Sequence, residues 1–266
     1  MVAEPGSSIT SNRDRFRCTV DCTRSKPHHF GMATPSITLH NGSLLVVGSA
    51  ASAADLESTS AEGAAACCDL VEVRLDLLEA PSKQPWRHLS SLPILFTARS
   101  GKEGGAGDLS AQQRMNLIES VLDDASLIDI EVASIIDMPA LLEQLRQRDI
   151  PWIASFHDFT QLPNQDVMGH AATIALKAGA AAFKIAAHLS GPEDLARLIA
   201  FQKADHGLPV ASMGMGPLAP LSRIQCALAG STLNYGFLHG TATAPGQWSA
   251  IKLKRAISES NASPDF

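Results

Sequence analysis

The feature that most constrains the fold is a regular alternation between short, continuous apolar runs and longer stretches with helical periodicity. Continuous apolar runs are typical of strands that are covered on both faces, as in a parallel sheet wrapped by helices. Counting Leu44 to Gly48 as the first, eight runs are expected to form strands, the others being Leu70 to Leu75, Ile94 to Ala98, Leu127 to Val132, Trp152 to Phe156, Ala181 to Ala186, Leu208 to Met213 and Thr232 to Leu238.

Helical patterns separate these strands and follow the last of them. They are Ser52 to Ala66, Ser110 to Leu122, Met138 to Arg146, Asp166 to Ala178, Pro192 to Lys203, Pro217 to Ala229 and Trp248 to Ser258. Eight such units in about 220 residues predict a (β/α)8 TIM barrel over residues 37–258, with its active site at the C-terminal ends of the strands. A doubly wound open sheet is the structural alternative. It lacks support, since no G-x-G-x-x-G is present and the glycine-rich stretch 101–107 does not end in G-K-[ST].

The two ends of the chain differ from this pattern. Residues 37–39 and 44–47 flank Asn41-Gly42, which predicts a β-hairpin before the first barrel strand. Residues 1–36 have no apolar periodicity and are expected to be a disordered extension, and residues 259–266 a short tail. Alternatives for the extension are a zinc site on Cys18, Cys22, His28 and His29, a transit peptide, or a start at Met32.

Charge and cysteine content narrow the function classes. The net charge of -6 gives no general attraction for nucleic acid or anionic lipid, so an anionic ligand would need individually placed cations. No apolar run is long enough to span a membrane. Five cysteines without C-x-x-C spacing suit a reducing cytoplasm better than a disulfide framework.

Charged side chains mark the predicted strand ends. In the second strand, period-two alternation places Glu72, Arg74 and Asp76 on one side, facing the barrel axis. Three charges inside a barrel need one another or a ligand, and a structural ion-pair network is the competing interpretation, most of all for Asp76. His157 ends the fifth strand, where a histidine would point into the face at which barrel chemistry takes place.

Lys184 is the most informative residue, because it lies within the predicted strand Ala181 to Ala186 among small and apolar residues. Lysine is almost never fully buried without a partner, so the alternative of a surface lysine fits this segment badly. Desolvation favours the neutral amine that can attack a carbonyl. A Schiff-base lysine inside a barrel is therefore the leading hypothesis. Arg223, near the start of a predicted helix, is a candidate for binding a carboxylate, with an ordinary surface arginine as the alternative.

Seven motifs in register also resemble a known family. From Gly42 to about Ala256, the order E-x-R-x-D, F-T-x-R-S-x-K-E-G-G, D-x-E, H-D-F, F-K-I-A, M-G…S-R and A-P-G-Q resembles the type I 3-dehydroquinate dehydratases of the shikimate pathway. The resemblance implies a hydro-lyase that converts 3-dehydroquinate to 3-dehydroshikimate, with no cofactor and no metal, and usually a homodimer.

The resemblance also assigns roles to individual residues. Lys184 is similar to the family's Schiff-base lysine, His157 to its general acid/base and Glu103 to the acid that orients the histidine. Residues similar to those that bind the substrate are Glu72, Arg74 and Arg99 for the ring hydroxyls, Arg223 and Gln247 for the carboxylate, Met215 beside the ring, and Thr243 where the family often has serine.

Two assignments and two functions stay open at this level. The methionine of the site is either Met215 or Met213, and the polar residue of the first strand is either Gly48 or Ser49. A Schiff-base aldolase on a similar barrel is the nearest alternative enzyme, although the 241–247 region offers no obvious phosphate nest. A barrel that binds a metabolite without turning it over is the alternative from another class.

Overall fold

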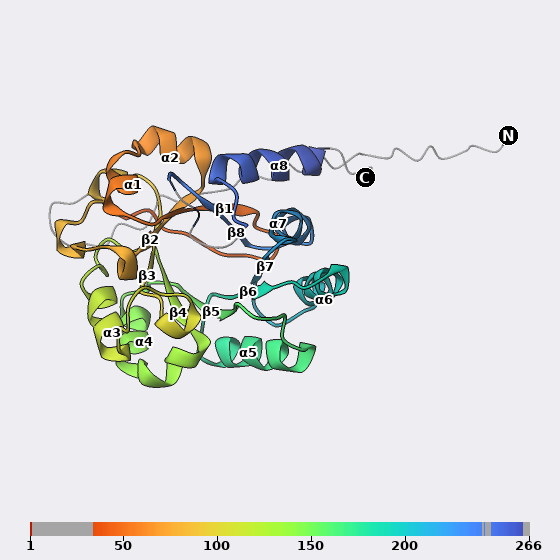
Figure 1. Ribbon diagram of the computed structural model, residues 1–266. Coiled ribbons are helices and arrows are strands. Elements are labelled where there is room, and N and C mark those ends of the chain that lie inside the picture. The colour runs from red at the N-terminus through yellow and green to blue at the C-terminus, as the bar shows by residue number, and fades with distance from the viewer. Residues whose placement is uncertain (2–33, 241, 243–245, 263–266) are drawn as a thin grey trace.

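The computed structural model describes residues 1, 34–240, 242 and 246–262, and it shows eight parallel strands that form a nearly closed barrel with helices outside (Figure 1). The strands are β1 (Leu45–Ala50), β2 (Leu70–Arg74), β3 (Ile94–Thr97), β4 (Leu127–Glu131), β5 (Trp152–Asp158), β6 (Ala182–His188), β7 (Val210–Met215) and β8 (Leu233–Phe237). Each predicted strand is present, and the open-sheet alternative is excluded because β1 lies between β2 and β8.

The seam between β7 and β8 is where the barrel is least regular. Each of the other neighbouring strands pairs in register, as in Val47 with Leu70 and Tyr235. Across the seam, the Thr232 amide donates to the Val210 carbonyl (2.9 Å), and the Ser212 amide donates to the Ser231 hydroxyl (3.1 Å). A side chain therefore supplies part of the hydrogen bonding that a regular ladder would provide.

In the part of the chain that the structure describes, eight α-helices pack around the barrel: α1 (Ala53–Glu57), α2 (Ala61–Cys67), α3 (Ala111–Glu119), α4 (Pro139–Gln147), α5 (Gln165–Lys177), α6 (Pro192–Lys203), α7 (Ala219–Leu228) and α8 (Ala250–Ala262). The single helix predicted from Ser52 to Ala66 is in fact two. The buried Thr59 hydroxyl donates to the Asp55 carbonyl and ends α1, and Ser60 then caps α2 by accepting from the Gly63 amide. Serine and threonine compete with helical hydrogen bonds in this way.

The barrel interior has an apolar lower half and a polar upper half. Inward positions near the strand starts are apolar, namely Leu45, Val47, Leu70, Leu95, Leu127, Ile153, Ala182, Ala211 and Leu233. Outward positions such as Val71, Val73 and Phe183 belong to a second core between strands and helices. The predicted orientation of β2 is confirmed for Glu72 and Arg74, which line the pocket. Asp76 is not part of the strand, because β2 ends at Arg74 and residues 75–77 form a 3-10 turn. The apolar floor leaves the C-terminal ends as the only polar end of the interior among the described residues.

The predicted N-terminal hairpin is wrong. The Asn41-Gly42 turn forms, with Gly42 at φ +82° and the Ser43 amide donating to the His40 carbonyl, but residues 37–39 form no strand. Ile37 and Leu39 instead pack on the apolar floor of the barrel. Covering that floor removes apolar surface from water, which an isolated two-stranded ribbon would not do as well.

Two expectations concern the ends of the chain and the membrane. The alternative zinc ligands Cys18, Cys22, His28 and His29 lie outside the described residues, as does the rest of 2–33. Within the described part, no helix is long and apolar enough to cross a membrane, and no group of three or more His, Cys, Asp or Glu side chains is arranged to hold a metal ion.

Candidate active site

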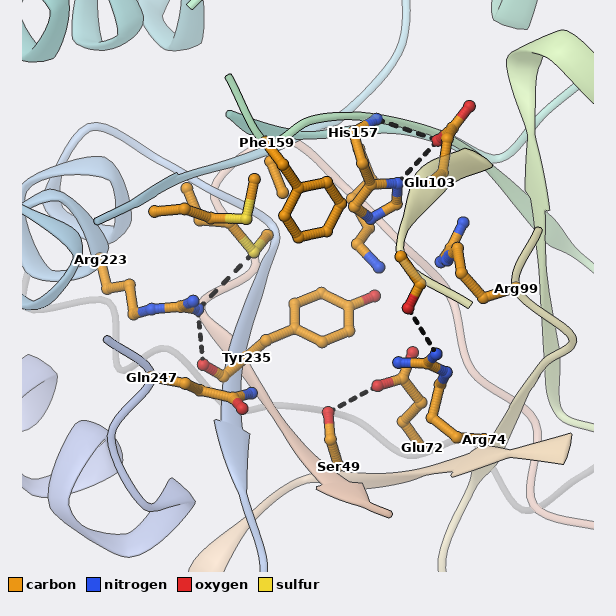
Figure 2. A pocket seen from close by; sticks show the side chains of 15 residues that line it. Ser49, Glu72, Arg74, Arg99, Glu103, His157, Phe159, Arg223, Tyr235 and Gln247 are labelled. Atoms are coloured by element: carbon orange, nitrogen blue, oxygen red, sulfur yellow. Dashed lines mark hydrogen bonds and ion pairs between the residues drawn. The ribbon is translucent and has the colours of Figure 1, made fainter. Parts of the chain in front are cut away.

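A pocket opens at the C-terminal ends of the strands, and side chains from nearly every strand converge on it (Figure 2). Its lining includes nine of the ten predicted site residues: Glu72, Arg74, Arg99, Glu103, His157, Lys184, Met215, Arg223 and Gln247. The tenth, Thr243, lies outside the described residues. Residues separated by up to 175 positions in the chain are thus brought together, as expected for a barrel site.

Lys184 lies deep in the pocket and is held by two neighbours. Its side chain is buried, with the residue only 4% exposed, which excludes a surface lysine. The Nζ atom lies 3.0 Å from Oδ2 of Asp129 on β4 and 4.1 Å from the ring centroid of Tyr235 on β8. A carboxylate and an aromatic face both stabilise the ammonium form of Lys184. They would stabilise any other positively charged form of the same nitrogen equally well.

Arg99, Asp129 and Glu131 form a buried ion-pair network beside the lysine. The two terminal nitrogens of Arg99 reach Asp129 (2.9 Å) and Glu131 (3.2 Å), and Glu131 also accepts from Arg114 (2.6 Å). Ser155 donates to Asp129 as well. Burial alone would raise the pKa of Asp129, but Arg99 and Lys184 outweigh it and lower that pKa, so this carboxylate is ionised.

His157 is fixed by Glu103 from the loop after β3. Oε2 of Glu103 lies 2.8 Å from Nδ1 of the histidine and also accepts from its backbone amide (3.0 Å). Burial, together with the nearby charges of Arg99 and Lys184, lowers the pKa of His157 well below its usual value, so the ring is neutral at pH 7. Burial raises the pKa of Glu103 to about 7. With Nδ1–H donated to the carboxylate, Nε2 is the basic nitrogen.

The glycine-rich loop is what brings Glu103 to the histidine. Gly101–Glu103 form a single 3-10 turn, and Gly104 then takes φ +84°. At Gly105 a β-carbon would lie 2.0 Å from the Arg99 carbonyl oxygen, so the chain can fold back on itself only with glycine there. The loop thus serves local geometry and not phosphate binding.

A second polar group surrounds Glu72 on the β1–β3 side of the pocket. Glu72 accepts from Ser49 (2.5 Å) and Thr97 (2.9 Å). This settles the choice on strand β1: Ser49 faces the pocket, whereas a side chain at Gly48 would collide with Leu238 and Cys68 on the outer face. Arg74 is held in a bidentate pair by Asp76 at 2.9 and 2.7 Å, which confirms a structural role for Asp76.

Arg223 approaches from the opposite side, on α7. It is 3% exposed, and its Nη1 donates to the Tyr235 carbonyl at 2.8 Å. Its Nε has no hydrogen-bond partner, and no carboxylate lies within ion-pair distance among the described residues. Burial lowers the pKa of this guanidinium to about 10, still far above neutrality. Both methionine candidates, Met213 and Met215, line the pocket here, because they are two residues apart on one strand.

Sequence reasoning assigned no site role to several residues that line or support the pocket, among them Asp129, Phe159 and Tyr235, and it left Ser49 unassigned. For Asp129 a signal was present, since D-x-E repeats on β4 the charged alternation of β2. Tyr235 lies in an apolar run where the period of two also places it inward, but an aromatic residue there is ordinarily core.

Comparisons with known proteins agree with this geometry. Residues 46–264 match the family model "Type I 3-dehydroquinase". The chain is 34% identical over 223 residues to a 3-dehydroquinate dehydratase of Haloquadratum walsbyi, covering 78% of this chain and 90% of the relative. It is 32% identical over 207 residues to one of Methanothrix thermoacetophila, covering 77% and 87%.

A solved structure shares the fold. The type I 3-dehydroquinate dehydratase from Clostridium difficile, determined with covalently modified comenic acid, superposes with a TM-score of 0.74 at 22% identity, covering 85% of this chain and 96% of that one. Since the family model spans most of the chain and the sequence relatives cover most of their own length, the chain belongs to the type I 3-dehydroquinases.

Proposed function

We propose that this chain performs the reaction of its family, the dehydration of 3-dehydroquinate to 3-dehydroshikimate, through an imine on Lys184. One observation supports this most strongly: the buried Nζ of Lys184 shares a pocket with a neutral histidine on the adjacent strand. Lys184 pairs with Ser155 in the sheet, and His157 is two residues further along β5, roughly 6.6 Å nearer the mouth by strand rise. Because the Lys184 side chain is long, its Nζ can reach the level of the His157 imidazole even though its backbone lies deeper in the barrel.

Imine formation is the first step. Lys184 must first lose the proton that Asp129 stabilises. The free amine then adds to the C3 ketone, and loss of water from the carbinolamine gives the iminium. Asp129 and the Tyr235 ring lie beside the nitrogen and stabilise its positive charge.

The second step is elimination of water across C1 and C2 of the ring. The iminium withdraws electrons from C2, so Nε2 of His157 removes a C2 proton and leaves an enamine. The enamine electrons then expel the C1 hydroxyl, to which the imidazolium returns the proton, and water departs. Hydrolysis of the conjugated imine releases 3-dehydroshikimate and restores the amine of Lys184.

Binding groups orient the substrate at both ends. Arg223, which has no carboxylate partner among the described residues, supplies a guanidinium fork for the substrate carboxylate, and Gln247 lines the same pocket. The family resemblance assigns Thr243 to this end as well, although Thr243 lies outside the described residues. Glu72 and Arg74 face the ring hydroxyls. Arg99 lines the same end, but its terminal nitrogens already donate to Asp129, Glu131 and Ser155, so its larger effect is to keep His157 neutral. A homodimer and activity without a cofactor remain predictions from the family resemblance, and a cytoplasmic location remains a prediction from the cysteine content.

Borohydride trapping tests the mechanism. Reduction of wild-type protein in the presence of 3-dehydroquinate should add the mass of one reduced ligand, on the peptide that contains Lys184. Lys184→Ala should add none and lose on the order of 10⁴-fold or more in kcat. His157→Ala should still be labelled while losing roughly 100- to 10,000-fold.

The exposed Lys177 on α5 provides the matched control, because Lys177→Ala should be labelled and active like the wild type. Labelling at another lysine, or full activity in Lys184→Ala, would refute the mechanism. Loss of labelling in His157→Ala would instead assign the histidine an essential part in forming the imine.

A further inference from the structure

Tyr235 carries a polar atom that the protein itself does not use. The residue is 4% exposed and lines the pocket, yet its hydroxyl has no hydrogen-bond partner among the described residues. Its neighbours in the site are satisfied in a different way: Glu72, Asp129 and Arg99 each have protein partners. A buried hydroxyl without a partner is unfavourable, so its presence at the centre of a binding pocket indicates a partner in the ligand.

We propose that Tyr235 is a specificity-determining residue, whose hydroxyl donates a hydrogen bond to the substrate hydroxyl on C4, the ring carbon next to the imine carbon. This proposal deepens the proposed function and rests on it, because the position of the substrate is set by the bond to Lys184. It adds a contact to the substrate that the arginine and glutamate residues at the two ends of the pocket do not provide.

The position of the ring selects this substrate hydroxyl. The Nζ of Lys184 lies 4.1 Å from the centroid of the Tyr235 ring, so a ligand joined to that nitrogen lies along the same ring. Figure 2 shows the phenol oxygen directed away from Arg223 and towards the end of the pocket where Arg99 and Glu72 lie. With the carboxylate on C1 at Arg223, the opposite end of the ring carries the C4 and C5 hydroxyls. Of these two, C4 is bonded to the imine carbon and thus lies nearest Nζ.

The chemistry of the phenol fits a donor. Burial, with the nearby charges of Glu72 and Asp129, raises the pKa of Tyr235 well above its usual value. The phenol therefore keeps its proton throughout the working pH range and cannot act as a base. A site with a buried group that must be hydrogen-bonded discriminates strongly against an analogue that lacks the matching hydroxyl, since binding then leaves the group without a partner.

The test compares Tyr235→Phe with the wild type on two substrates. The variant keeps the ring beside Lys184 and removes only the hydroxyl. With 3-dehydroquinate, kcat/KM should fall roughly 10-fold. With the analogue that lacks the C4 hydroxyl, the variant should equal or exceed the wild type, so the preference of the wild type for the hydroxylated substrate should shrink by about the same factor. The melting temperature of the unliganded variant should be unchanged or higher, because a buried hydroxyl without a partner has been removed.

Three outcomes would overturn the proposal: equal losses on both substrates, no loss on either, or a fall in melting temperature that accounts for the lost activity. Borohydride labelling separates these from failure of the proposed function. If the wild type is labelled on Lys184 but the two substrates respond alike to Tyr235→Phe, only the role of Tyr235 is refuted. If the wild type is not labelled on Lys184, the imine mechanism itself fails.

Discussion

The two sides of the pocket are built on opposite principles. On the β3–β6 side, Arg99 and Lys184 are buried within 3.2 Å of a carboxylate, either Asp129 or Glu131. On the β7–β8 side, Arg223 is equally buried, but among the described residues its acceptors are the Tyr235 carbonyl and the Met213 sulfur, neither of them charged. The paired side is complete before substrate arrives and fixes the reacting groups. Under the proposed function, the substrate completes the other side, and the charge of Arg223 serves to bind it.

This contrast has a thermodynamic consequence. Removing one partner of a buried ion pair leaves the other without compensation and destabilises the fold. Removing a buried cation that has no carboxylate partner relieves a desolvation penalty and should not. The two sides of the pocket are therefore expected to respond oppositely to the same substitution, arginine to methionine.

The largest effect on stability is expected for Arg99→Met. Asp129 and Glu131 would each lose a buried cation, so the free energy of unfolding should drop by about 3–5 kcal/mol, which thermal denaturation would record as a fall of roughly 10 °C. Arg148→Met is the matched control, because that arginine pairs with Asp123 at the surface and should change stability by less than about 1 kcal/mol. Similar melting temperatures for the two variants would show that the network is not structural.

Arg223→Met should separate binding from stability. Losing the guanidinium that binds the substrate carboxylate should weaken transition-state binding by about 2–4 kcal/mol, which would be measured as a fall in kcat/KM. The melting temperature should stay unchanged or rise, since burial already disfavours this charge, as its pKa of about 10 indicates. Arg223→Lys retains the positive charge but not the two-pronged guanidinium, so its kcat/KM should lie between those of the wild type and Arg223→Met. Wild-type activity in Arg223→Met would show that the substrate carboxylate binds elsewhere. A large fall in its melting temperature would show that the two sides of the pocket do not differ in their effect on stability.

The smallest effect concerns pH and the hydrogen bond between Glu103 and His157. As pH falls through about 7, the pKa of Glu103, the carboxyl becomes protonated and donates to Nδ1. The proton of the neutral histidine then resides on Nε2, and the basic nitrogen is lost. Wild-type kcat/KM should therefore decline on the acid side with an apparent pKa near 7.

Glu103→Gln supplies the check on that assignment. The amide oxygen still accepts from the imidazole, so at pH 8 kcat/KM should fall only about 2- to 10-fold. Because glutamine does not titrate, the acid limb should move to lower pH, towards the depressed pKa of His157. An acid limb that stays near pH 7 in Glu103→Gln would assign it to another group.

The local pattern of the sequence determined the strands, and with them the barrel and most of the site. Period-two alternation requires that Glu72 and Arg74 share a face and that Lys184 face the interior with Ala182 and Ala186, and parallel strands bring their carboxyl ends together. The motifs in register then supplied the chemistry. These conclusions depend on spacing along one strand at a time, which is why one sequence suffices for them.

Tertiary structure alone decided the partners. Three features depend on residues from different strands that meet only in the closed barrel. They are the carboxylate that holds Lys184, the choice between Ser49 and Gly48 as the residue that faces the pocket, and the lack of a carboxylate beside Arg223 within the described part of the chain. The same holds for the N-terminal segment, where a strong local turn signal predicted a hairpin and Ile37 and Leu39 instead cover the barrel floor. Local propensity is worth little against the burial of apolar surface, and burial is defined only once the whole fold exists.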